Sequence, residues 1–449
     1  MPAAPTNRNV IWIFGDQHRA HMLGCNGDPN VFTPTIDRLS NDGVNVAGAV
    51  SGFPLCCPYR GSLLTGRYPH HAVRGHEYPM PDGMPTIAHA FKEHGYETAW
   101  FGKWHVDGFR ESEGRAAFHV VPPHRRGGFD TWLGYENNNA QWDSWVHGTG
   151  AEKPYRLPGY ETDCLTDLLL DYLKKRGKQR SRGEGKPFFA ALSVQPPHDP
   201  YVAPEQFMRR HTPGRVRPRP NVPPIPRIEQ RARRDLAGAH AMVENLDHNV
   251  GRVLHTLVET GLADDTWIVF FSDHGDMHGS HGQFNKTAPW EEAIRVPLII
   301  GGAGRLGTRY HSRRGRPDAL VNHVDMAPTT LGLCGIEKPR WMVGCDYSGL
   351  VCPERTCETT PDSAYLQCVE ATGHPDSVDR PWRGVVTRDG WKYVCLEHQP
   401  WLMFNLNEDP WEMVNLAHNT AFKARRSRLH GRLAQWVAET GDSFALPEV

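Results

Sequence analysis

Cys56 and Arg60, four positions apart, are the first candidates for chemistry in this chain of 449 residues. In the run Cys56-Cys57-Pro58-Tyr59-Arg60, only Cys56 has a proline two residues on and an arginine four residues on. Cysteine can supply a nucleophile, and arginine can bind an anion. The run also fits a buried structural cysteine beside a proline turn, because free cysteine is among the most buried residue types. The motif alone leaves both interpretations open.

Further polar residues fall on turns and at the ends of predicted strands. Asp16 and Asp273 offer the hard oxygen ligands that Ca²⁺, Mg²⁺ or Mn²⁺ require. Taken singly, Asp16 could be a helix cap and His198 a hydrogen-bonded structural residue. The remaining candidates for metal binding, anion binding and proton transfer are Gln17, Lys103, His105, His274 and Lys286. Their joint occurrence favours one site for an anionic ester.

The elements that must position these residues alternate between strands and helices. We expect strands at 9–14, 98–101, 188–194, 267–271 and 296–300, and helices at 35–43, 60–65, 86–94, 163–173 and 236–260. This order predicts an α/β domain with a large mixed, mainly parallel sheet flanked by helices. The polar residues follow the carboxyl ends of the strands, where open α/β sheets bind ligands.

The pattern changes after about residue 360. The segment 382–396 predicts a hairpin that turns at Asp389-Gly390, and a helix is expected at 421–440. We therefore predict a catalytic domain over 1–360 and a small C-terminal subdomain over 361–449, with an antiparallel sheet and one helix. Two basic runs, 174–182 and 209–234, are interpreted as solvated surface loops.

Composition excludes several classes of protein. Hydrophobic residues make up 39% and charged residues 22%, and the net charge of −1 gives no attraction to nucleic acid or to a membrane surface. No stretch approaches the roughly 20 apolar residues of a membrane span, and the first residues lack a secretory apolar region. We expect a cytoplasmic location, which a trimmed leader would change. The ten cysteines lack zinc-finger spacing. Four that cluster are interpreted as reduced structural thiols, with a local disulfide as the alternative in an exported protein: Cys345, Cys352, Cys357 and Cys368.

In order along the chain, these motifs resemble the formylglycine-dependent (type I) sulfatases of the alkaline phosphatase superfamily. The run 56–67 resembles the C-x-P-x-R signature followed by T-G-R, and 95–105 resembles the more specific second signature. The turn at 197–201, the segment 273–286 and the segment 405–416 resemble the active-site histidine turn, the second metal strand with its lysine, and the C-terminal signature. The resemblance covers nearly the whole chain. It implies an alkaline phosphatase-like fold and sulfuric ester hydrolysis.

The same resemblance implies two cofactors. A formylglycine-generating maturation enzyme, a transient partner, would oxidise Cys56 to an aldehyde whose hydrate attacks sulfur. A divalent metal, Ca²⁺ before Mn²⁺ or Mg²⁺, would complete the site. Its implied ligands are Asp16, Gln17, Cys56 as formylglycine, Asp273 and His274.

Proton transfer and charge are assigned by the resemblance to five side chains. Arg60 and Lys103 would hold the nucleophile and offset its charge. His198, helped by Lys286, would protonate the departing alcohol. His105 would then take a proton from the second hydroxyl of the hydrate, so that sulfate is expelled and the aldehyde returns.

Two departures from the family pattern bear on function. Tyr59 replaces the commonest serine, but the maturation signal depends chiefly on the cysteine, proline and arginine. Gln17 stands where many sulfatases have a second aspartate, and Asp-Gln with Asp-His also occurs in phosphonate monoester hydrolases and phosphodiesterases. A phosphonate monoester or phosphodiester hydrolase is therefore the alternative function. An inactive protein that binds sulfated glycans is a third hypothesis, which the retained catalytic residues oppose.

A polar and aromatic loop at 134–148 suggests how substrate is bound. Trp142, Trp145 and His147 are the candidate contacts with a sulfated carbohydrate, because aromatic rings stack on sugars; an ordinary packed loop is the alternative. Three residues that follow the signature helix are also expected to line the cleft: Arg74, His76 and Glu77. The oligomeric state stays open.

Overall fold

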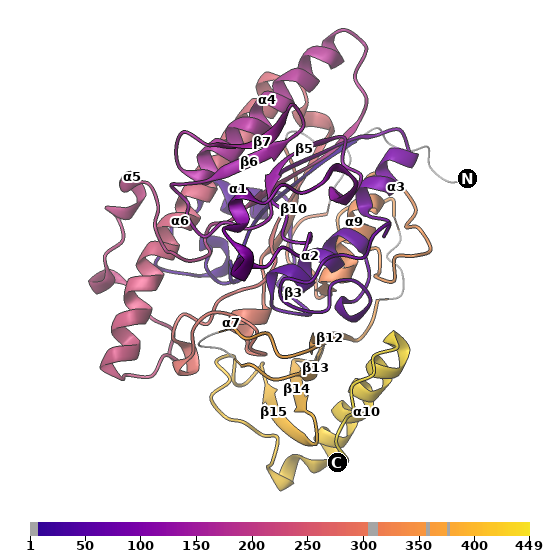
Figure 1. Cartoon of the computed structure of the whole chain (residues 1–449). Coiled ribbons are helices and arrows are strands. Elements are labelled where there is room, and N and C mark those ends of the chain that lie inside the picture. Colours follow the sequence, from indigo (N-terminus) through magenta and orange to yellow (C-terminus); the bar gives the residue numbers. More distant parts are fainter. Residues whose placement is uncertain (1–7, 304–312, 356–359, 375–377) are drawn as a thin grey trace.

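The computed structural model describes residues 8–303, 313–355, 360–374 and 378–449 (Figure 1). A nine-stranded sheet forms its centre, and the middle strands β9, β1, β8, β4 and β5 pair in parallel while the outer pairs are antiparallel. In spatial order the strands are β2 (Val44–Asn45), β10 (Leu298–Gly302), β9 (Thr266–Ser272), β1 (Asn9–Gly15), β8 (Phe188–Val194), β4 (Glu97–Lys103), β5 (Thr131–Tyr135), β6 (Trp145–Gly148) and β7 (Ala151–Arg156). Beside it, β3 (Gly48–Val50) pairs with β11 (Leu320–Asn322). The predicted mixed, mainly parallel sheet is confirmed.

Helices cover both faces of this sheet (Figure 1). Side chains of β1 alternate between two apolar cores: Trp12 and Phe14 enter one, and Ile11 and Ile13 enter the other. The first core includes α2 (Cys56–Thr65), α3 (Ile87–Glu93) and α9 (Met326–Leu333), and the second includes α1 (Pro34–Asp42), α4 (Glu161–Ser181) and α6 (Pro226–Glu259). The short helices are α5 (Glu205–Met208) and α7 (Glu291–Ile294). A strand buried on both faces explains why β1 reads as a continuous apolar run.

The C-terminal subdomain is a four-stranded antiparallel sheet covered by one helix, as predicted. Its elements are β12 (Ser363–Cys368), β13 (Trp382–Thr387), β14 (Trp391–Leu396), β15 (Gln399–Asn405) and α10 (Lys423–Thr440). Lys392 of this sheet is fully buried and bonds both to Glu412 and, at 3.2 Å, to Glu291 of α7. Buried charges therefore join the subdomain to the large sheet's domain. The predicted boundary at residue 360 stays a prediction.

Both basic runs that the sequence placed in loops lie partly in helices. The helix α4 continues to Ser181, and α6 begins at Pro226. Lysine, arginine and glutamine are good helix formers, so a basic run can continue a helix whose other face is buried. Gly177 shows this packing, because a Cβ there would lie 2.6 Å from Cβ of Thr260. No helix among the described residues is long and apolar enough to span a bilayer.

The nine described cysteines are all free thiols, and Cys357 lies outside the described residues.

Candidate active site

Strand register brings the candidate residues together. Asp16 directly follows β1 and Asp273 directly follows β9, and the last residues of these strands, Gly15 and Ser272, are paired. His198 lies four residues beyond the end of β8, and Lys103 is the last residue of β4. Because these four strands are parallel neighbours, their carboxyl ends meet at one edge of the sheet.

Cys56 is the first residue of α2, and its side chain points into this edge. Its Sγ lies 3.4 Å from Oδ1 of Asp16, 3.1 Å from Nε2 of His274 and 3.4 Å from Nζ of Lys286. Ligand atoms of Asp16, Cys56, Asp273 and His274 all lie within 4.8 Å of one another, and all four residues are buried. Nδ1 of His274 lies 2.9 Å from the carbonyl oxygen of Gly275, so it carries the proton and leaves the Nε2 lone pair facing the cluster. The four residues form a cluster that can hold a metal.

Gln17 is the fifth predicted metal ligand, and it directly follows Asp16. Its NH₂ group donates to the carboxylate of Asp276 and to the hydroxyl of Tyr201, which settles the amide orientation. Its Oε1 is buried and has no hydrogen-bond partner among the described residues. Buried amide oxygens without partners are rare. An amide oxygen is a hard ligand of the kind that a divalent cation prefers, and the metal-binding role of Gln17 stays a prediction.

Arg60 contacts residues at the carboxyl ends of all four strands, β1, β4, β8 and β9. Its guanidinium donates to the carbonyl of Lys103 at 3.0 Å and to Oγ of Ser193 at 2.8 Å, and it pairs with Asp16 at 3.3 Å and Asp273 at 3.2 Å. The side chain is fully buried. Its contacts are with the metal-binding carboxylates, so it positions them; the structure places no hydrogen bond between Arg60 and Cys56.

The charges of the site set the ionisation of its groups. Burial raises the pKa of Asp16, but Lys103, His198, Lys286 and His274 outweigh burial and hold that pKa well below its usual range. The Nζ of Lys103 lies 2.7 Å from Oδ2 of Asp16. Burial and Asp16 raise the pKa of the Cys56 thiol, yet the nearby cations bring it below its ordinary value. An anion at this position is therefore stabilised.

His198 and Lys286 contact each other beside Cys56. Nζ of Lys286 is 2.7 Å from Nε2 of His198, and Nδ1 of His198 is 2.8 Å from the carbonyl oxygen of Asp199. Both side chains are buried. Burial and Lys286 lower the pKa of His198 to about 4.

His105 follows β4 in a strained conformation. Its φ is 58°, in the region that favours glycine, and both ring nitrogens are buried with no hydrogen-bond partner among the described residues. Burial and Lys103 hold the pKa of His105 well below its usual range, so the ring is neutral. A neutral imidazole with free nitrogens can accept a proton.

Two residues of the site escaped the sequence interpretation. Asp276 orients Gln17, but in sequence it reads only as part of a turn. His374, from the loop before β13, brings the C-terminal subdomain to the site: its ring centroid is 5.5 Å from that of His76. Burial, and then Lys286 and neighbouring histidines, lower the pKa of His374 to about 2. Isolated histidines in loops carry no local signal of such a position.

The side chains of the predicted substrate-binding loop differ in exposure and in their contacts. Gln141 donates to the carbonyl of His198 at 3.0 Å, so the loop adjoins the active-site turn, and Trp142 is 49% exposed. Trp145 is partly buried and donates to Asp143. His147 is fully buried and its Nε2 accepts the backbone N–H of Val121 at 2.8 Å. That packing makes His147 a structural residue, which corrects its predicted contact with substrate.

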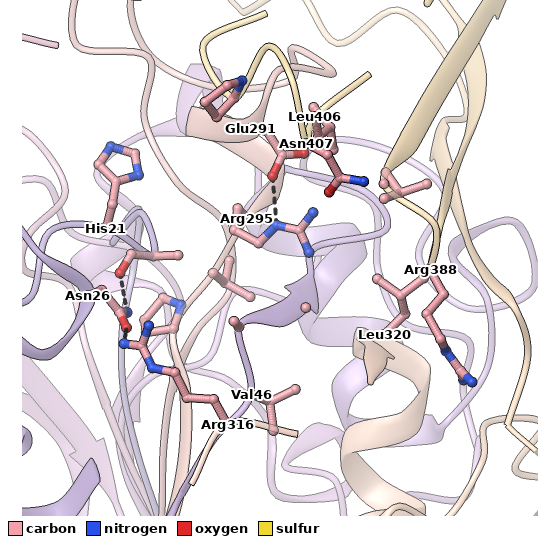
Figure 2. Close-up of a pocket in the computed structure, with 18 of the residues that line it drawn as sticks. His21, Asn26, Val46, Glu291, Arg295, Arg316, Leu320, Arg388, Leu406 and Asn407 are labelled. Atoms are coloured by element: carbon pink, nitrogen blue, oxygen red, sulfur yellow. Dashed lines mark hydrogen bonds and ion pairs between the residues drawn. The ribbon is translucent and has the colours of Figure 1, made fainter. Parts of the chain in front are cut away.

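A pocket of about 550 Å³ lies between the two parts of the chain, away from these residues (Figure 2). Arg295 donates to Glu291 at 2.7 Å, and Arg316 donates to Oδ1 of Asn26 at 2.8 Å. None of the candidate catalytic residues lines this pocket. Residues of both the large domain and the subdomain line this pocket.

Comparison with known proteins assigns the family. The sulfatase family profile matches residues 8–336, and the profile of the C-terminal region of N-sulphoglucosamine sulphohydrolase matches residues 279–439. An ulvan-active sulfatase of Formosa agariphila is 33% identical to this chain over 98% of this chain and 83% of its own length. The structure of the protein BT4656 with its substrate D-glucosamine-2-N,6-O-disulfate aligns with a TM-score of 0.82 and 22% identity, covering 97% of this chain and 98% of that one. A phosphonate monoester hydrolase of Agrobacterium radiobacter aligns with a TM-score of 0.75 and 22% identity, over 96% of each chain.

Fold and family together define an ester hydrolase with the alkaline phosphatase architecture and a cluster that can hold a metal. The chain belongs to the sulfatase family of that superfamily and is a sulfuric ester hydrolase.

Proposed function

We propose that this sulfatase removes the sulfate ester of a carbohydrate, using formylglycine made from Cys56 and a divalent metal, with Ca²⁺ as first choice. The observation that carries the proposal is the convergence of Asp16, His274 and Lys286 on Sγ of Cys56, at 3.4, 3.1 and 3.4 Å. A formylglycine-generating enzyme is the transient partner that this residue requires. The ligand set of mostly oxygen donors favours Ca²⁺, Mg²⁺ or Mn²⁺ over softer ions.

A metal ion would supply positive charge to the site, and formylglycine would supply the nucleophile. A metal held by Asp16, Gln17, Asp273 and His274 would polarise an oxygen of the sulfate. Hydrated formylglycine at position 56 would supply an oxygen nucleophile that can later release sulfate by elimination. Arg60 fixes both metal-binding carboxylates, so the ligand geometry exists before substrate arrives.

The chain's own residues handle the sulfate and the protons. Lys103 and Lys286 are buried cations on two sides of the cluster and bind the negative charge of the ester. His198 and Lys286, in contact with each other, deliver a proton to the leaving alcohol oxygen. His105, neutral and unpartnered, accepts the proton whose loss expels sulfate.

The leaving alcohol lies beside three neutral histidines, which are His76, His105 and His374. The ring of His76 lies 6.1 Å from that of His105 and 5.5 Å from that of His374. Burial, followed by Lys286, lowers the pKa of His76 to about 4, so near neutral pH both His76 and His374 are uncharged. Neutral imidazoles donate and accept hydrogen bonds, which suits sugar hydroxyls. The similarity to an ulvan-active sulfatase supports a carbohydrate substrate.

Phosphonate or phosphodiester hydrolysis is the second candidate. Gln17 favours it, because a neutral amide in place of a carboxylate leaves the ligand set less negative and thus more tolerant of a phosphoryl group. Lys103 and Lys286 can bind the negative charge of either a sulfate or a phosphoryl group.

Two measurements test the proposal. Peptide mass spectrometry of the segment around Cys56 should show the mass of the aldehyde in place of the thiol. Matched aryl sulfate, phosphonate monoester and phosphodiester substrates should then show the highest kcat/KM for sulfate, and Cys56→Ala should lower it by a factor on the order of 10³ or more. Dominant phosphoryl turnover would overturn the sulfatase assignment, and full activity of Cys56→Ala would overturn the nucleophile.

A further inference from the structure

A second group of metal-ligating side chains lies beside the catalytic cluster. It consists of Cys57, His76 and His105, and one ligand atom of each lies within 4.8 Å of the others. Cys57 is the second residue of α2, His105 follows β4, and His76 lies in the loop between them. None of the three belongs to the cluster of Asp16, Cys56, Asp273 and His274.

The donor atoms of this group are buried and available. His105 is 3% exposed, and neither of its ring nitrogens has a hydrogen-bond partner among the described residues; Nδ1 of His76 is also buried without one. Sγ of the fully buried Cys57 accepts the backbone N–H of Glu77 at 3.4 Å, which leaves further lone-pair capacity. Buried polar atoms nearly always have partners, so three unpartnered imidazole nitrogens beside a thiol are available to coordinate a metal ion.

The donor types select the class of ion. One sulfur and two imidazole nitrogens suit Zn²⁺, which binds thiolate at about 2.3 Å and imidazole at about 2.0 Å. The oxygen-rich cluster of Asp16 and Asp273 instead suits Ca²⁺, Mg²⁺ or Mn²⁺. The side chain of His76 is 29% exposed, so an ion can enter from its side.

We propose that Cys57, His76 and His105 form an inhibitory Zn²⁺ site in this enzyme. On binding, the Cys57 thiol releases its proton to solvent and coordinates as thiolate, while each imidazole coordinates through a neutral nitrogen. The ion then occupies the lone pair with which His105 accepts a proton, so turnover stops until Zn²⁺ is removed. Inhibition rests on the proposed function of His105; binding of the ion does not.

The experiment uses fully matured, Ca²⁺-loaded enzyme and three forms of the chain: wild type, Cys57→Ser and Cys334→Ser. Serine at 57 keeps the volume and can accept the N–H of Glu77, but its hydroxyl is a poor zinc ligand. Cys334 is an equally buried thiol remote from the site, whose Sγ lies 3.4 Å from the carbonyl of Arg8, so it is the matched control. Turnover is measured against free Zn²⁺ in a metal buffer, and reversal is checked with chelator followed by Ca²⁺.

Wild type and Cys334→Ser should be inhibited reversibly, whereas Cys57→Ser should keep wild-type activity without zinc and require on the order of 100-fold more Zn²⁺ for the same inhibition. Equal inhibition of all three forms would place Zn²⁺ at the Asp16–Asp273 cluster and overturn the proposal.

Binding of Co²⁺ gives a readout independent of turnover. A thiolate-to-cobalt absorption band should appear in wild type and be absent in Cys57→Ser; absence of the band in wild type would also overturn the site. A band without any sulfatase turnover would instead contradict the proposed function alone.

Discussion

Nζ of Lys286 donates to Nε2 of His198 across 2.7 Å, and this contact fixes which of the two carries the proton in the resting enzyme. Nδ1 of His198 lies 2.8 Å from the carbonyl of Asp199 and therefore holds the other ring proton. Burial and Lys286 lower the pKa of His198 to about 4, and the pKa of Lys286 is raised because Cys56, Asp16 and other anions outweigh its burial. In the proposed mechanism, the proton for the leaving alcohol would be held by the lysine and passed along the pair.

Replacing His198 by alanine should harm poor leaving groups most. An alkyl sulfate leaves as a strongly basic alkoxide and needs the proton, so its kcat should fall by about 10²–10⁴. A nitrophenyl sulfate has a stable leaving group and should lose far less. Steady-state kinetics on both esters, at equal metal loading, test this; equal losses on the two substrates would show that His198 does not serve proton transfer.

Replacing Lys286 by methionine should change the pH profile of the residual activity. Burial, the larger cause of the lowered pKa of His198, remains in this variant, but loss of the lysine charge raises that pKa above about 4. His198 itself then carries the proton below that pKa, so residual kcat should increase as pH falls from 8 to about 5.5. Wild type should show no inflection from His198 in this range. A flat profile for Lys286→Met would contradict the shared-proton interpretation.

Replacing Asp276 by asparagine should weaken the metal site. Oδ2 of Asp276 accepts from both Gln17 and the hydroxyl of Tyr201, and an asparagine NH₂ cannot accept. Gln17 would lose the bond that orients its Oε1, and metal affinity should fall by about 10–100-fold. Chelator titration of metal-dependent activity measures this. Saturating metal should restore most of kcat, since the proton-transfer groups are untouched.

Replacing His374 by alanine should separate binding of the alcohol from chemistry. Loss of one hydrogen bond costs about 0.5–1.5 kcal/mol, so KM for a sulfated oligosaccharide should rise by about two- to tenfold. A small aryl sulfate that does not reach the subdomain should keep its KM and kcat. Equal effects on both substrates would show that His374 only supports the local fold.

Replacing Asp442 by asparagine should loosen the C-terminal helix. Asp442 accepts from Arg383 at 2.6 and 3.0 Å and from Tyr365 at 2.7 Å, with both charged side chains nearly fully buried. Breaking a buried pair costs about 3–5 kcal/mol. Hydrogen exchange of α10, followed by mass spectrometry, should show the loss of protection.

The contribution of Asp442 to the stability of the fold should decrease at low pH. Burial raises the pKa of this carboxyl, but Arg383 outweighs burial and brings it below the ordinary 3.8. A depressed pKa stabilises the fold fully above the pKa of the unfolded chain, and this stabilisation is lost as pH falls through the folded value. The difference between wild type and Asp442→Asn should be constant from pH 8 to about 5 and shrink below about 4.

The sheet and most of the site could be predicted because their signals are local. A strand buried on both faces, such as β1, is a short apolar run, and Asp16 follows it directly. His374 could not be predicted, because its place depends on how the subdomain packs on the sheet, far away in sequence. Nor does any local pattern tell an exposed ring such as Trp142 from the buried ring of His147. The basic end of α4 resembles a solvated loop in sequence, because its charged residues are also good helix formers and leave no apolar pattern.

The burial of the C-x-P-x-R motif sets an order of events in the life of the chain. In the folded protein Cys56 is 2% exposed and Arg60 is not exposed at all, because its guanidinium is bonded to four strand ends. The proposed maturation enzyme, if it binds Cys56, Pro58 and Arg60 as a linear peptide, would reach them only before α2 packs onto the sheet. On the proposed function, oxidation of Cys56 would therefore have to precede folding, and a chain that folded first would keep a thiol at position 56.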